Sequence, residues 1–420
     1  MPKLLWVSPL SIHDTASASA TQMRNMLLSL RARDVDIVAL SALNFVNDSG
    51  TSMFTDLEEK LKNSKENSFS LNDNQINCIY MRTQSRRLAD MISQEQRNLY
   101  AKFCGIINSF RPDVVMGTGS DVMSMVCFDE AHRRGLPTAY VLLDGTPRRF
   151  NFPNIDVVIT DSNAIANLYA TQHRINCVVT GSFLPVTSPI LQAQAQKEKQ
   201  KEGAEPVERT RITMINPSVE KGLAIFLQMA KTAIKNKEAK GFKFSVYETY
   251  EGQFKQQVAL LHKKDSTDAA FEDKDLKDIE VLGPQTPNVE VLESTKLLVV
   301  PSLTFEGIVN IAREAIACGI PVLATNQLGL AESVGEAGIL VDVPPYCTAD
   351  PKTVPESTDI NGWLKGLNMG LTQDFTERCQ NMTKKNDVNI SGNRLAIILK
   401  PLFDLRAGNN PQLLRNGSLI

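Results

Sequence analysis

Two glutamates beside a short apolar segment are the residues of this sequence whose types and spacing most clearly suggest binding chemistry. The run from Leu297 to Val300 is apolar and β-branched enough to be a buried strand. A helical pattern follows over 307–318, and Gly319 ends it, so Glu306 is expected at a helix N-terminus. Glu314 comes eight residues later, two turns deeper on nearly the same face of that helix.

The backbone next to Glu306 is expected to bind an anion. In the predicted helix the amides of Gly307, Ile308 and Val309 point out of the N-terminus. Free amides together with the helix dipole favour a phosphate group at that position. Carboxylates at the two ends of such a helix can accept hydrogen bonds from sugar hydroxyls. The combination indicates recognition of a nucleotide sugar.

A lysine in an electrostatically unfavourable position supports the same interpretation. The strand pattern of 211–215 is followed by a short loop and then by a helix, and Lys221 lies where that helix begins. A cation at a helix N-terminus opposes the helix dipole. A bound diphosphate would compensate for this, whereas the alternative is an ordinary exposed lysine.

Alternating strands and helices are expected to position these residues. Lys3 to Ser8 is predicted to be the first strand, followed by a polar loop, a helix to about Arg33 and a second strand. This order is typical of a Rossmann-type half. The loop over 9–20 has no glycine and is therefore not a dinucleotide fingerprint.

The pattern of residues between 44 and 144 predicts the structure of four further segments. Residues 44–74 read as an irregular polar insertion with one short helix. A second helical stretch leads to Phe110 and carries four arginines: Arg82, Arg86, Arg87 and Arg97. Such a basic face could meet an acidic acceptor or an anionic membrane surface, but Asp90 and Glu95 interrupt it and favour a solvated face. Ser120 or Asp121 is expected to cap the next helix. Asp144 follows a predicted strand, as either a cleft residue or a turn former.

Length and composition restrict the class of protein. A chain of 420 residues exceeds the usual size of a single core, so two domains are expected. With 42% apolar residues, 22% charged residues and a net charge of −2, it lacks the basic excess of a nucleic-acid-binding protein. No apolar stretch is long enough for a transmembrane helix, and the N-terminal residues do not read as a signal peptide. The seven cysteines are unclustered, which favours buried thiols in a reducing cytoplasm, and the four dispersed histidines predict no metal site.

The motifs around the two glutamates have a familiar order. Pro301-Ser302, Glu306-Gly307, Glu314-Ala315 and residues 319–322, Gly-Ile-Pro-Val, resemble the retaining glycosyltransferases of the GT-B fold, family 4, also described as glycosyl transferases group 1. The resemblance implies an α/β protein with two Rossmann-like domains facing each other across a deep cleft. The expected divisions are an acceptor-side domain over 1–185, a linker over 186–209, a nucleotide-sugar domain over 210–385, and a helix and tail over 386–420 that cross back to the first domain.

The resemblance also implies roles for individual residues. Lys221 would contact the donor diphosphate, Glu306 the sugar near its anomeric carbon, and Glu314 the ribose hydroxyls. Asn216 stands where the family commonly has an arginine, and no histidine precedes Asp144, which departs from the family pattern. The remaining substrate-binding candidates lie in the first loop, which faces the cleft in the family, and in a loop beside the base: Ser11, His13, Gly283 and Pro284.

The function implied is transfer of a sugar, with retention, from a nucleoside diphosphate sugar to an unidentified acceptor. A UDP-sugar is the expected donor, and neither a metal nor another cofactor is required. The alternatives are another GT-B enzyme, such as a nucleotide-sugar epimerase or an inverting transferase, and a non-catalytic nucleotide-sugar-binding protein. The expected partners are the donor and the acceptor, without nucleic acid, and peripheral contact with a membrane is left open.

Overall fold

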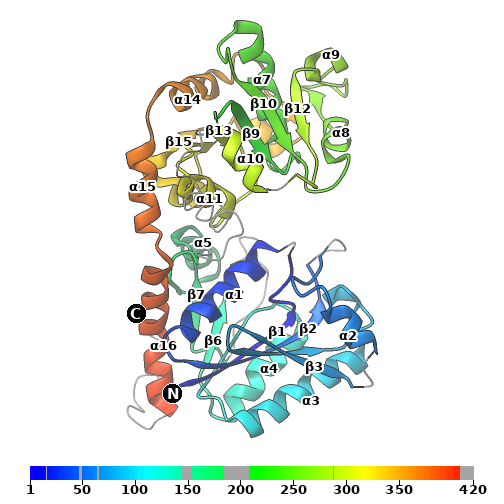
Figure 1. Cartoon of the computed structure of the whole chain (residues 1–420), viewed down its shortest axis with the longest axis vertical. Coiled ribbons are helices and arrows are strands. Elements are labelled where there is room, and N and C mark those ends of the chain that lie inside the picture. The colour runs from blue at the N-terminus through cyan, green and yellow to red at the C-terminus, as the bar shows by residue number, and fades with distance from the viewer. Residues whose placement is uncertain are drawn as a thin grey trace, which may run out of the picture. The chain divides into compact units, whose positions relative to one another are not determined.

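The computed structural model describes residues 1–15, 17–46, 50–63, 66–143, 154–183, 208–286 and 288–406. The chain forms two compact units, which are drawn in Figure 1 and described separately below. The N-terminal unit comprises Met1–Pro185 together with Asp387–Ile420, and the C-terminal unit comprises Val186–Asn386. No helix among the described residues is both long enough and apolar enough to cross a membrane.

The N-terminal unit contains an eight-stranded sheet in the order β3-β4-β2-β1-β5-β6-β7-β8. All neighbouring strands are parallel except β3, which runs antiparallel to β4 at the edge. The strands are β1 (Lys3–Leu10), β2 (Asp36–Asn44), β3 (Ser68–Asp73), β4 (Ile76–Met81), β5 (Val114–Gly117), β6 (Thr138–Val141), β7 (Val157–Thr160) and β8 (Cys177–Val179). The helices of this unit are α1 (Ala18–Arg31), α2 (Leu57–Asn63), α3 (Ser93–Phe110), α4 (Val122–Arg133), α5 (Asn163–His173) and α16 (Val388–Arg406), with a short 3₁₀ turn at Leu88–Asp90.

Both faces of this sheet are covered, which explains the continuous apolar runs in its strands. Along β1, Leu4 and Trp6 belong to one buried cluster, whereas Leu5 and Val7 belong to another on the opposite face. The first cluster includes side chains of α1 and α16, and the second includes side chains of α3, α4 and α5. Figure 1 shows α16 passing beside one end of α1, where Arg33 donates to Asn393 Oδ1 at 2.8 Å. The hydroxyl of Ser391 donates to the carbonyl of Ser182 at 2.7 Å.

Two expectations for the first half need correction. The segment 44–74 is not irregular throughout, because β3 forms an edge strand there in addition to the short helix α2. Of the four arginines, only Arg97 lies on α3, since that helix begins at Ser93. Arg86 pairs with Glu58 at 2.8 Å and Arg87 with Asp90 at 2.9 Å, so those arginines do not form a helix face. A third expectation, that Ser120 or Asp121 caps the next helix, is confirmed, because Asp121 is the N-cap of α4.

The C-terminal unit contains a parallel six-stranded sheet in the order β12-β10-β9-β13-β14-β15. Its strands are β9 (Arg211–Ile215), β10 (Lys243–Tyr247), β12 (Ile279–Leu282), β13 (Thr295–Val300), β14 (Val322–Thr325) and β15 (Gly338–Val341). The chain winds outward from β9 through β10 to β12, and then returns to the other side of β9 with β13. The order therefore reverses between β9 and β13, which makes this the topological switch point of a doubly wound sheet.

Helices cover the C-terminal sheet. They are α7 (Leu223–Asn236), α8 (Gln253–Val258), α9 (Asp273–Leu276), α10 (Asn288–Ser294), α11 (Asn310–Ala317), α12 (Leu328–Val334), α13 (Pro345–Ala349), α14 (Asn361–Thr372) and α15 (Thr376–Lys385), with a 3₁₀ turn at Gly335–Ala337. All of these helices except α13 contribute side chains to one large buried cluster with those of the strands. After Val343 the chain forms α13 and the strand β16 (Thr353–Val354), which pairs with β11 (His262–Lys263).

Candidate functional site

The two loops at the switch point bring Lys221 and Glu306 together. Because β9 and β13 are parallel neighbours, the loops that leave their carboxyl ends lie side by side. Lys221 is in the loop after β9, Glu306 is in the loop after β13, and their side chains form an ion pair. The side chain of Lys221 is 38% exposed and that of Glu306 is 16% exposed, so the pair lies near the surface and a ligand can reach it.

Close packing of the two loops sets this geometry. Gly222 has φ of 83°, and a Cβ atom there would lie 1.9 Å from the carbonyl oxygen of Pro301. Only glycine therefore allows the β13 loop to approach so closely. The amide of Leu303 donates to the carbonyl of Glu220 at 3.0 Å and joins the two loops through the backbone. Lys221 is consequently held beside Glu306 by the backbone on either side of it.

Side chains from its own loop and from the loop after β14 fix the position of Glu306. The hydroxyl of Ser302 donates to Glu306 Oε1 at 2.6 Å, and the Glu306 amide donates to Gln327 Oε1 at 3.2 Å. Gln327 Nε2 in turn donates to the carbonyls of Ser302 and Thr304, at 3.2 and 3.0 Å. A Cβ atom on Gly329 would lie 1.7 Å from the carbonyl oxygen of Glu306. The β13 loop is therefore tied to the residues that follow β14.

The predicted helix after Glu306 begins later than expected. Helix α11 starts at Asn310 with Val309 as its N-cap, so Glu306 lies in the preceding loop and not at a helix N-terminus. The expectation of three open amides is also wrong, because the Val309 amide donates to Ser333 Oγ at 2.9 Å. Among the described residues, the amides of Gly307 and Ile308 have no hydrogen-bond partner. Two amides beside the ion pair are thus available to an anion.

Glu314 occupies a different position from the one its spacing suggested. It lies in the middle of α11, half-buried, and has interaction partners within the protein. Because Glu306 precedes the helix, the two carboxylates do not stand two turns apart on one helix face.

The other candidates of the C-terminal unit lie at the same edge of the sheet. Asn216 adopts φ of 58° directly after β9, and its side-chain oxygen accepts from Gln253 Nε2 at 2.5 Å. Gly283 and Pro284 follow β12, which is separated from β9 by β10. The hydroxyl of Tyr247 donates to the carbonyl of Pro284 at 3.4 Å. These residues form the turns that follow β9 and β12 at the carboxyl edge of the sheet. None of them forms a hydrogen bond or an ion pair with Lys221 or Glu306 among the described residues.

The candidates of the N-terminal unit take part in a buried polar network. His13 is 2% exposed, with Nδ1 at 2.6 Å from the hydroxyl of Tyr80 and Nε2 at 2.9 Å from Asp73. The Tyr80 hydroxyl also lies 3.0 Å from Ser11 Oγ, and Arg24 donates to both oxygens of Asp73 at 2.6 and 2.8 Å. Neither Ser11 nor His13 offers a polar atom to solvent in this structure. Asp144 lies outside the described residues.

Burial and charge act in opposite directions on the pKa values of this network. Burial lowers the pKa of His13, and the hydrogen bond to Asp73 only partly offsets this. Burial raises the pKa of Asp73, but hydrogen bonds from His13 and Arg24 outweigh it and leave that pKa below its ordinary value. Burial raises the pKa of Tyr80. The network is therefore a neutral histidine between a phenol and a charged Asp–Arg pair.

Sequence reasoning gave no role to the side chains that hold the loop of Glu306 in place. Ser302 donates to the Glu306 carboxylate, Gln327 accepts from the Glu306 amide, and Ser333 accepts from the Val309 amide. One signal was available, since Gln327 comes two residues after β14 and so lies at the carboxyl edge of a parallel sheet. The hydrogen bonds themselves depend on tertiary packing.

Among the described residues, no group of three or more histidine, cysteine, aspartate or glutamate side chains could hold a metal ion. All seven cysteines are free thiols and five of them are buried.

Comparison with known families shows what the C-terminal unit resembles. Residues 211–349, which carry the whole switch-point site, match the family model described as glycosyl transferases group 1. This segment is therefore similar to a group 1 glycosyl transferase domain. The search of curated proteins found no match.

Solved structures extend the similarity to the whole chain. A glycosyltransferase from Rickettsia africae ESF-5 is 15% identical, with a TM-score of 0.60 over 97% of this chain and 99% of that one. The α,α-trehalose 6-phosphate synthase from Burkholderia multivorans is 12% identical, with a TM-score of 0.60 over 97% and 98%. Anabaena HepE in complex with UDP and glucose is 15% identical, with a TM-score of 0.59 over 96% and 100%. At these identities the matches show the fold, which is the GT-B fold.

Proposed function

We propose that this chain transfers a sugar, with retention of anomeric configuration, from a nucleoside diphosphate sugar to an acceptor. The observation that carries the proposal is the meeting of Lys221 and Glu306 at the switch point of a glycosyl transferase domain. Open α/β sheets bind their ligands at the carboxyl ends of the strands at such a point. Anabaena HepE, which has the same fold, has been solved in complex with UDP and glucose and in complex with UDP-glucose, and this supports a UDP-sugar as donor.

The proposed role of Lys221 is to neutralise the diphosphate. A diphosphate carries more negative charge than one carboxylate, so it can replace Glu306 as the partner of this ammonium group. The amides of Gly307 and Ile308 would donate to phosphate or sugar oxygens. When the bond between the anomeric carbon and the diphosphate oxygen breaks, its electrons pass to the diphosphate. The lysine and the amides stabilise that developing charge without a metal ion.

The proposed role of Glu306 is to contact the sugar once Lys221 turns to the phosphate. Ser302 and Gln327 hold its carboxylate and backbone in place, so the position is set before the sugar binds. Glu314, on α11, would bind the ribose hydroxyls of the donor. In a front-face mechanism the departing phosphate accepts the proton of the acceptor hydroxyl, and the acceptor oxygen bonds to the same face of the anomeric carbon.

A panel of nucleotide sugars tests the proposal through thermal unfolding of the full chain. A donor at about 100 times its Kd should stabilise the protein by about 2.7 kcal/mol. The nucleoside monophosphate and the free sugar serve as controls, since both lack the diphosphate that Lys221 is proposed to bind. Release of free sugar from the stabilising donor, measured without acceptor, separates a transferase from a binding protein. If no nucleoside diphosphate sugar stabilises the chain or is hydrolysed by it, the proposal is wrong.

A further inference from the structure

A second concave surface lies at the opposite edge of the C-terminal sheet. It is a groove of about 520 Å³ between the end of α7 and the amino ends of β10 and β12. The Lys221–Glu306 pair lies at the carboxyl edge, and a strand of five residues such as β10 spans roughly 15 Å between the two edges. The groove is therefore separate from the candidate donor site.

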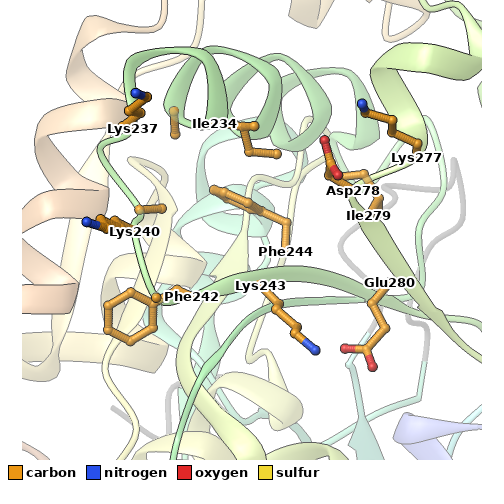
Figure 2. Close-up of a pocket in the computed structure, with 13 residues that line it drawn as sticks. Ile234, Lys237, Lys240, Phe242, Lys243, Phe244, Lys277, Asp278, Ile279 and Glu280 are labelled. Atoms are coloured by element: carbon orange, nitrogen blue, oxygen red, sulfur yellow. The ribbon is translucent and has the colours of Figure 1, made fainter.

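The floor of the groove is apolar and its rim is basic, as Figure 2 shows. Phe244 is 1% exposed and Ala239 is 8% exposed, and these residues form the base with Ala233. Four lysines surround them: Lys237, Lys240, Lys243 and Lys277. They come from the end of α7, from the turn before β10, from the start of β10 and from the segment before β12. The four lysines therefore come from different elements around the groove.

These lysines form no salt bridges within the part of the chain that the structure describes. None of the four ammonium groups there forms a hydrogen bond or a close ion pair. The hydrogen bond from Arg211 and, to a smaller extent, the charge of Lys243 lower the pKa of Glu280, so Lys243 has one acidic neighbour. Two acidic residues line the groove, Asp278 and Glu280. Glu280 is already held by Arg211 through two hydrogen bonds of 2.7 and 2.9 Å, so it neutralises that arginine. The rim keeps a positive excess, and the repulsion between its cations would be relieved by a bound anion.

We propose that this groove binds a phosphate group carried on an apolar or ring-shaped body. Lysine is a point charge with donors in several directions, which suits the oxygens of a tetrahedral phosphate more than a planar carboxylate. The apolar floor offers contact to the organic part of the ligand, and the volume falls in the usual range for small-molecule sites. The phosphate can belong to a free metabolite or to a phospholipid headgroup, and the experiment below distinguishes these sources.

Site-resolved lysine acetylation of the full chain, read by mass spectrometry, tests the proposal. Only the neutral amine reacts, and an anion beside a lysine favours its charged form. A rise of one pKa unit lowers the reactive fraction about tenfold, so we expect up to about tenfold slower acetylation of the rim lysines with ligand bound. The probes are phenyl phosphate, inorganic phosphate and phosphatidylglycerol vesicles, each at ionic strength matched with sodium chloride.

Lys365 and Lys384, exposed on α14 and α15, are internal controls whose acetylation should not change. Slower acetylation of the rim lysines with phenyl phosphate, and less with inorganic phosphate, supports a free organic phosphate. Slower acetylation with anionic vesicles alone supports a lipid headgroup. If no probe slows the rim lysines more than the two controls, the proposal is overturned. Because the readout is confined to the rim, it does not depend on any glycosyl transfer.

A charge-reversal variant provides a second measurement. In the double variant Lys237→Glu/Lys240→Glu, the phosphate probe should no longer slow the acetylation of Lys243 and Lys277. The double variant Lys365→Glu/Lys384→Glu makes the same change of net charge, and there the probe should still slow their acetylation. All four substituted side chains are exposed, so the fold should tolerate either pair. Equal protection of Lys243 and Lys277 in both double variants would count against a phosphate site in the groove.

Discussion

Replacement of Lys221 by alanine gives the sharpest test of the candidate site. The substitution removes the ammonium group but leaves the Ser302 hydroxyl, which donates to Glu306 at 2.6 Å. Glu306 is therefore not left without a hydrogen bond. The side chains of the ion pair are 38% and 16% exposed, and solvent screening limits such a pair to about 0–1 kcal/mol of stability. The variant is expected to fold and to lose little free energy of unfolding.

The expected effect on transfer is much larger. A cation placed on the developing charge of a leaving diphosphate contributes about 2–4 kcal/mol to transition-state stabilisation. Each 1.36 kcal/mol is a factor of ten in rate, so kcat/KM should fall about 30- to 900-fold. The difference between a small loss of stability and a large loss of rate is what a catalytic role predicts.

The assay measures donor turnover and thermal unfolding for Lys221→Ala and for a matched control. Lys231 forms a similar ion pair with Asp275, at 2.9 Å, with side chains 42% and 13% exposed. That pair lies outside the switch-point loops, so Lys231→Ala should match Lys221→Ala in stability but keep the wild-type rate. If Lys221→Ala transfers sugar as fast as Lys231→Ala, the placement of the diphosphate beside Lys221 is refuted.

Three further predictions concern stability and its dependence on pH. Gly329→Ala places a Cβ atom 1.7 Å from the Glu306 carbonyl oxygen, so it should destabilise the chain by about 1–3 kcal/mol and weaken stabilisation by the donor in a thermal-shift assay. Gly105→Ala, at an exposed position inside α3 with nothing within 4 Å, should stabilise by about 1 kcal/mol in urea unfolding, and a loss of stability would contradict this. The lowered pKa of His13 means that the unfolded chain takes up its proton near 6.5 while the folded chain resists protonation. The contribution of His13 to the free energy of unfolding should therefore be fully present above about pH 6.5, and it should be lost as the pH falls from there through the folded pKa. His13→Gln should flatten this slope below about pH 6.5. An equal slope in the variant would show that His13 is not its source.

Strong local patterns made much of the C-terminal unit predictable. The run from Leu297 to Val300 was identified as a strand because it is short, apolar and buried on both faces. The start of α11 was misplaced because Glu306 to Val309 has no feature that excludes a helical turn. The packing of Gly329 against Glu306, and the hydrogen bond from the Val309 amide to Ser333, hold that segment outside the helix. Such contacts join residues far apart in the chain, so periodicity cannot reveal them.

The first loop shows the same limit more strongly. Ser11 and His13 are polar residues in a loop after a strand, and the sequence predicted them as substrate contacts. The edge strand β3 supplies Asp73 and its neighbour β4 supplies Tyr80, and these two residues bind the polar side-chain atoms of Ser11 and His13 inside the unit. Nothing local to Ser11 or His13 indicates those partners, because they lie some sixty or more residues away in the sequence.

The sequence alone determined the alternation of strands and helices, the two-part organisation and the order of motifs that resembles a glycosyl transferase, since these depend on composition and short-range spacing. Tertiary structure alone decided which side chains meet. The parallel pairing of β9 with β13 placed Lys221 against Glu306, although the two residues are separated by 85 positions in the chain. It also gathered the lysines at the other edge of the same sheet, because strand pairing sets which loop ends become neighbours.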